Sequence, residues 1–108
     1  MMREEAVSLL RRYKRDLRSR YKARFVHFYT QDVMFKRSVM GSFLCDTLIS
    51  RIRHSPEPPI DVVYDFYSML DDVLSESEDD HFETHQFASV MEYECGNILR
   101  FLREAEKE

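Results

Sequence analysis

Apolar residues recur every three or four positions along the N-terminal part of the chain. At 100° per residue, seven of them fall within about 60° of one line, which is the signature of an amphipathic helix. These residues are Ala6, Leu10, Tyr13, Leu17, Tyr21, Phe25 and Phe28. The pattern predicts a helix from about Glu4 to about Tyr29. A break is expected over residues 30–32, TQD, where Thr or Asp can cap the next helix.

Apolar positions nearly encircle the next predicted helix, from Val33 to Arg53, which is the pattern of a central helix. One seam holds Val33, Met40, Leu44 and Leu48, and a second holds Met34, Ser38, Gly41, Cys45 and Ile52. The small side chains of the second seam permit close approach of another helix. Gly41 also invites a helix-turn-helix interpretation, but the apolar pattern continues through it, so we predict one unbroken helix.

The segment HSPEPPID, residues 54–61, is the clearest interruption in the chain. Its prolines lack a backbone donor, and the residues that precede them avoid the helical region. We predict a third helix from Pro58 or Pro59 to about Ser75. Its broad apolar face holds Val63, Phe66, Tyr67, Leu70, Val73 and Leu74, and its acidic face holds Asp61, Asp65, Asp72 and Glu76.

A fourth helix is predicted after a polar connector, with Ser77 or Asp79 as its cap and its end at about Glu104. Its seam holds Phe87, Val90, Met91, Ile98, Phe101 and Leu102, flanked by Ala88, Cys95 and Leu99. Four such helices with short connectors predict an all-α fold. We therefore expect an antiparallel bundle or array of four helices that forms one domain over residues 1–108.

Charge changes this picture, because it is divided unevenly between the halves of the chain. Residues 1–54 carry thirteen Lys and Arg against five Asp and Glu, net +8, whereas residues 55–108 carry three against fifteen, net −12. The outer face of the first predicted helix holds Arg11, Arg12, Arg15, Arg18 and Lys22. This basic face and the acidic face of the third helix both point away from their own seams. Only edge residues such as Lys14 and Asp71 are then expected to pair, and such asymmetry indicates a charged partner surface.

Two features of the fourth predicted helix could carry a functional site: a pair of histidines and a glutamate on its apolar seam. His81 and His85 lie one helical turn apart, so they are weak candidates for a divalent metal, but the spacing is not that of a metalloprotease and a solvated face is favoured. Glu94 falls inside the apolar seam of the fourth helix and must be paired or protonated. We expect an ion pair between Glu94 and Arg51 or Arg24, both of which also intrude on apolar faces.

The sequence carries no signature of catalysis. No glycine-rich phosphate loop is expected from two glycines in the whole chain, and no convincing nucleophile and base accompany the cysteines. Cys45 and Cys95 pattern with core residues, which favours reduced thiols and a cytoplasmic location, although one bridge between them stays open. The N-terminus resembles neither a signal peptide nor a membrane span. We therefore expect no enzymatic activity, no cofactor and no membrane association.

Two functional hypotheses remain. The first is a small non-catalytic protein-interaction module, such as an adaptor, an inhibitor or an immunity-type regulator, that binds an unidentified protein or forms a homo-oligomer through its basic and acidic faces. The second is a nucleic-acid-binding accessory protein that places the basic face of the first helix against phosphates. The first is preferred because the acidic half of the chain repels nucleic acid.

Overall fold

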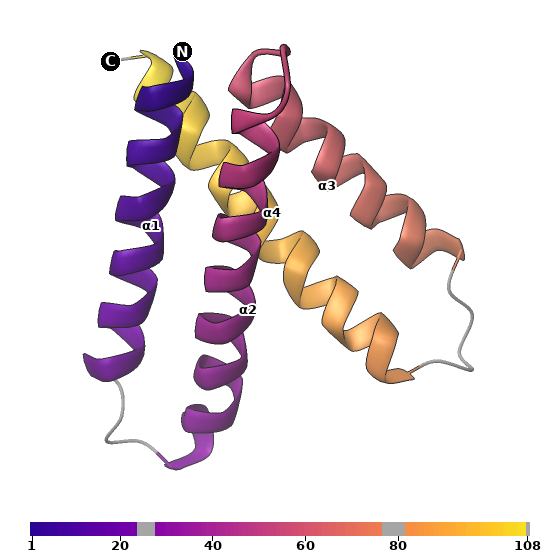
Figure 1. The fold of residues 1–108 in the computed structure, drawn as a ribbon. Coiled ribbons are helices and arrows are strands. Elements are labelled where there is room, and N and C mark those ends of the chain that lie inside the picture. The colour runs from indigo at the N-terminus through magenta and orange to yellow at the C-terminus, as the bar shows by residue number, and fades with distance from the viewer. Residues whose placement is uncertain (24–27, 77–81, 108) are drawn as a thin grey trace.

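Four helices form the part of the chain that the structure describes, and no strand occurs there. The computed structural model describes residues 1–23, 28–76 and 82–107, with side chains described at 1–19, 38–76 and 88–107. The helices are α1 (Arg3–Ala23), α2 (Phe28–Arg53), α3 (Pro59–Glu76) and α4 (Phe82–Lys107), as Figure 1 shows. The predicted all-α fold of four helices is confirmed.

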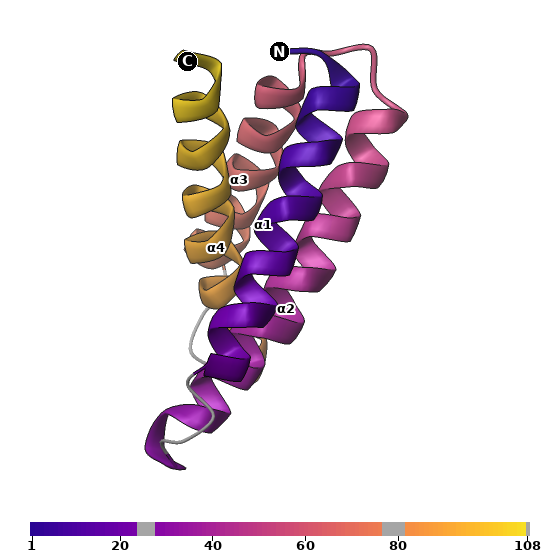
Figure 2. The same ribbon diagram turned by 90° about the vertical axis from the view of Figure 1, so that its left-hand side faces the viewer.

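The helices pair as two antiparallel hairpins, α1 with α2 and α3 with α4 (Figure 1). The hairpins meet at the end that holds both chain termini and the connector from α2 to α3, and they diverge toward their other ends (Figure 1). At the shared end the N-terminal ammonium of Met1 lies 3.2 Å from a carboxylate oxygen of Glu106. Viewed from the side in Figure 2, α1 lies in front of α3, with α2 and α4 flanking them. The two helices α2 and α4 each contact all three others, which agrees with the central position predicted for α2.

The boundary between the first two helices differs from the prediction. Residues 30–32 do not form a break, because α2 begins at Phe28 and already includes them, and Tyr29 belongs to α2. Thr and Asp are favoured both as caps and close to a helix N-terminus, so a TQD cluster marks a helix start only to within about one turn. The helix-turn-helix alternative is excluded, since α2 is continuous through Gly41.

The proline segment ends α2 and starts α3 as its chemistry predicts. Pro59 is the first residue of α3, where a missing N–H costs no hydrogen bond, and the carbonyl of Pro58 accepts the N–H of Val62 at 3.1 Å. Arg3 ties the start of α1 to this connector, because its guanidinium donates to the carbonyl of Ser55 at 2.6 Å. The connector therefore fixes one end of the α1–α2 hairpin.

The core consists of side chains from all four helices. Its fully buried large members are Val7, Leu10, Leu44, Leu48, Ile52, Val63, Ile98 and Leu102. Gly41 lies against Leu17 of α1, and a Cβ at that position would overlap the Leu17 side chain. The glycine thus permits the close approach of α1 and α2. Val73, predicted to lie on the buried face of α3, is instead 40% exposed, because α3 moves away from the α1–α2 hairpin toward its C-terminal end (Figure 1).

One carboxyl group is fully buried among the helices. Glu94 of α4 has no exposed surface, and one of its oxygens accepts a 2.9 Å hydrogen bond from the hydroxyl of Tyr13. Arg51, one of its two predicted partners, places its guanidinium 4.8 Å from the centre of the Phe66 ring, and none of the described ion pairs joins it to Glu94. The other predicted partner, Arg24, lies outside the described residues.

Both cysteines are free and fully buried. Burial raises the pKa of Cys45 and that of Cys95 from 9.0 to about 12. The predicted core position of both cysteines is confirmed. Among the described residues, no helix is both long enough and apolar enough to span a membrane.

Candidate binding site

A strongly charged concave surface of the described structure is a groove between α1 and α2. From α1 it receives Arg11, Lys14, Arg15 and Arg18, and from α2 it receives Asp46, Ile49, Ser50 and Arg53, with His54 at its end. Each set of four has the spacing i, i+3, i+4, i+7, which places its members on one stripe of a helix. Two such stripes on neighbouring antiparallel helices form the two walls of the groove, which has a volume of about 570 Å³.

The charge of this basic groove is strongly positive. Five of its side chains are Lys or Arg, and its one carboxylate is that of Asp46. Lys14 donates to both oxygens of Asp46, at 2.9 and 3.0 Å, so the carboxylate is already occupied. The predicted pairing of Lys14 with Asp71 is wrong, because Asp46 on the adjacent helix lies within reach of the lysine. The other cations of the groove form none of the described ion pairs.

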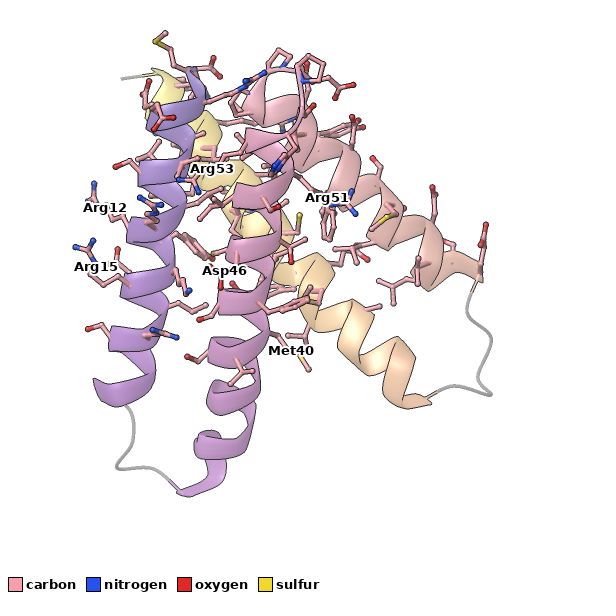
Figure 3. All side chains as sticks on the ribbon, viewed as in Figure 1. Arg12, Arg15, Met40, Asp46, Arg51 and Arg53 are labelled. Carbon is pink, nitrogen blue, oxygen red and sulfur yellow. The ribbon has the colours of Figure 1, made fainter. Side chains whose placement is uncertain are left out.

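Only part of the predicted basic face lines the groove. Arg11, Arg15 and Arg18 line the groove, whereas Arg12 does not, and Figure 3 shows Arg12 extending from α1 on the side away from α2. Arg15 extends in the same direction and so borders the outer edge of the groove (Figure 3). The side chain of Lys22 lies outside the described residues.

The α2 wall of the groove was missed by the sequence reasoning. Arg53, labelled in Figure 3, together with Asp46 and His54, completes the site, but none was predicted to belong to it. A signal was present, because residues 46, 49, 50 and 53 repeat the spacing of residues 11, 14, 15 and 18. On two antiparallel helices that pack side by side, two stripes with this spacing can line a shared groove, so the pattern could have predicted the site.

The acidic face lies on α3, and its four predicted members Asp61, Asp65, Asp72 and Glu76 are all exposed. Carboxyl groups crowd one another at the start of this face and, away from it, between α3 and α4. A hydrogen bond to the Asp65 carboxyl, together with the charge of Asp65, raises the pKa of Glu57 above its ordinary value. Partial burial and the charge of Asp71 raise the pKa of Glu92 on α4. A cation placed against this surface would relieve the repulsion.

The acidic face adjoins a smaller cavity of about 310 Å³ at the corner between α2 and α3. Glu57 and Asp65 line it together with Arg51 and His54. Its mixed charges leave it less suited than the groove to a strongly charged ligand. Among the described residues, the groove and the acidic face each carry a clear surplus of one sign.

The other candidates of the sequence give no site. His81 and the side chain of His85, the weak metal candidates, lie outside the described residues. Within the described residues, no group of three or more His, Cys, Asp or Glu side chains could hold a metal ion. No family model, curated protein or solved structure matches this chain.

Proposed function

We propose that this protein is a small non-catalytic interaction module that binds an acidic protein surface in the groove between α1 and α2. The observation that carries the proposal is the surplus of charge in a concave site. Five cationic side chains surround one carboxylate, and Lys14 already occupies that carboxylate. None of the described ion pairs includes an arginine of the groove, so these side chains have their donors available for an external partner.

Arginine is well suited to this task because its planar guanidinium can donate two parallel hydrogen bonds to one carboxylate. The groove presents such groups from both walls, Arg11 and Arg18 from α1 and Arg53 from α2. Ile49, which is 8% exposed, supplies an apolar floor between them. An acidic helix or extended segment could place carboxylates against both walls while its apolar atoms cover the floor.

Nucleic acid is the second candidate, since guanidinium groups bind phosphate with the same geometry. The observation in its favour is that the stripe of Arg11, Arg15 and Arg18 gives three arginines along about 10 Å of helix. Against it stands the acidic face of α3, which repels a long polyanion that extends beyond the groove.

The test measures binding of labelled poly-L-glutamate and of a labelled single-stranded oligonucleotide by fluorescence anisotropy at low and moderate salt. We expect binding of polyglutamate that weakens about fivefold or more when Arg11, Arg15 and Arg18 are replaced by Gln, because each lost contact costs about 0.3–1 kcal/mol. Tighter binding of the oligonucleotide, lost in the same variant, would favour the second candidate. No binding of either probe at low salt would overturn the proposal.

The compartment forms part of the proposal. We expect the module to act in the cytoplasm, because two free thiols in a small chain suit a reducing environment. No enzymatic activity is proposed for it.

A further inference from the structure

We propose that the acidic partner of the basic groove is the α3 face of a second copy of this chain, so that molecules associate head to tail. This inference rests on the proposed function, because it names the surface that the groove binds. The two surfaces carry opposite charge: the groove has a surplus of arginines, and the acidic face has four exposed carboxylates. Charge complementarity of this kind selects a partner and fixes its orientation.

The two surfaces cannot meet within one molecule. The groove belongs to α1 and α2, and α3 lies on the opposite side of the bundle from α1 in both Figure 1 and Figure 2. None of the described ion pairs joins a groove arginine to a carboxylate of α3. Both surfaces are therefore available at once, one for each neighbour in an assembly.

The spacing of the charges matches along the two helices. Arg11 and Arg18 are seven residues apart on α1, and Asp65 and Asp72 are seven residues apart on α3. Seven residues span two helical turns and about 10 Å, so each pair lies on one side of its helix. When α3 of one molecule lies along the groove of another, both carboxylates can face both guanidinium groups in a single register.

Crowding of carboxyl groups at the start of α3 gives the contact a further source of stability. Asp65 lies beside Glu57, and the proximity of these two acids raises the pKa of Glu57. A guanidinium placed against Asp65 would attract both groups and relieve their repulsion. The contact is heterologous, since different patches meet, so it leads to open chains of molecules unless a rotation closes a ring.

The first test is sedimentation of the full chain over a range of concentrations up to about 100 μM, where weak charged contacts become populated. We expect a mass above the 13.1 kDa of one chain that rises with concentration and returns to 13.1 kDa in high salt. A mass of one chain at all concentrations and salts would overturn the inference.

The second test is a charge swap between two variants. Arg11→Glu with Arg18→Glu reverses the groove, and Asp65→Lys with Asp72→Lys reverses the acidic face; all four positions are exposed, and circular dichroism checks that each variant folds. Each variant alone should stay monomeric. Their equal mixture should associate, because the acidic face of the first variant can bind the intact groove of the second, and the two reversed surfaces are complementary as well. Self-association of either variant alone, or a mixture that stays monomeric, would contradict the inference.

Failure of this inference is distinguishable from failure of the proposed function. If the wild-type chain is monomeric but its groove still binds polyglutamate, the partner is another acidic protein and self-association is wrong. If the chain neither self-associates nor binds polyglutamate, both proposals are wrong. Arg12→Gln is the matched control for association, because Arg12 lies on α1 outside the groove and its replacement should leave the mass unchanged.

Discussion

The hydroxyl of Tyr13 donates a 2.9 Å hydrogen bond to Glu94, and so joins the first helix to the last across 81 positions of sequence. The Tyr13 ring also lies 5.5 Å from the ring of Phe101, measured between centroids. These contacts hold α1 against α4, while Leu17, one turn further along the same stripe, lies against Gly41 of α2. Because α1 carries one wall of the basic groove, this buried pair helps to position the proposed binding site.

Replacing Tyr13 by Phe should lower the free energy of unfolding by about 1–3 kcal/mol, because a buried carboxyl group then loses one of its donors. Denaturant unfolding followed by circular dichroism measures the change. Tyr64→Phe is the control, since Tyr64 is 49% exposed on α3 and its variant should unfold like the wild type. Equal stability of Tyr13→Phe and Tyr64→Phe would show that the hydrogen bond contributes nothing to the fold.

The two glycines should respond in opposite ways to the same replacement. Gly96→Ala should stabilise the chain by about 0.5–1 kcal/mol, because the helix gains propensity and the new Cβ would lie in ordinary contact with Tyr67. Gly41→Ala should destabilise it by roughly 1 kcal/mol, since the overlap with Leu17 outweighs the same gain. Thermal unfolding of the two variants compares them directly, and a Gly41→Ala chain as stable as Gly96→Ala would be incompatible with this close helix contact.

The buried thiols should be unreactive in the folded protein. A disulfide reagent at about pH 8 should label neither Cys45 nor Cys95 until denaturant is added, because the thiolate is the reacting species. A thiol whose pKa is higher in the folded than in the unfolded chain stabilises the fold below its ordinary pKa. That contribution should be lost as the pH rises from about 9 to about 12, and replacing Cys45 by Ala should make the fall in stability shallower. Rapid labelling of the native chain would contradict the burial of both groups.

The raised pKa of Glu57 should depend mainly on the neighbouring Asp65. Asp65→Asn should bring the pKa of Glu57 down toward its ordinary value, since Asp65 is the main cause of its elevation. A carbon-detected NMR titration of the glutamate side chains measures the change. Asp72→Asn, on the same helix, should leave the Glu57 pKa where it is in the wild type. A Glu57 pKa that is the same in all three proteins would remove the evidence for crowding.

Hydrophobic periodicity and the proline segment were sufficient to predict the number of helices, the start of α3 at Pro58 or Pro59 and most of the core, because apolar stripes and prolines act locally. Contacts between helices were harder to predict. The divergence of the two hairpins, which leaves Val73 exposed, depends on packing that no single helix encodes. The start of α2 was predicted at Val33 instead of Phe28, because capping residues are also tolerated inside the first turns of a helix.

Only the α1 part of the candidate site was predicted, because the pattern of one helix does not show how two helices pack together. Arg11, Arg15 and Arg18 were recognised from the charge pattern of one helix. The groove requires two helices, and its α2 wall with Arg53 became visible only when the hairpin was formed. The prediction gave Arg12 the same role as Arg11, Arg15 and Arg18, because a helical wheel drawn for one helix does not show which side of the basic face the neighbouring helix borders.

The central claim is that the groove, and not the general positive charge of α1, binds an acidic partner. The most direct measurement compares polyglutamate binding by Arg11→Gln and Arg12→Gln, two neighbouring arginines of which only Arg11 lines the groove. Loss of one groove contact should weaken binding about two- to fivefold in Arg11→Gln and leave Arg12→Gln close to the wild type. Equal loss in the two variants would contradict the account and indicate a diffuse basic surface.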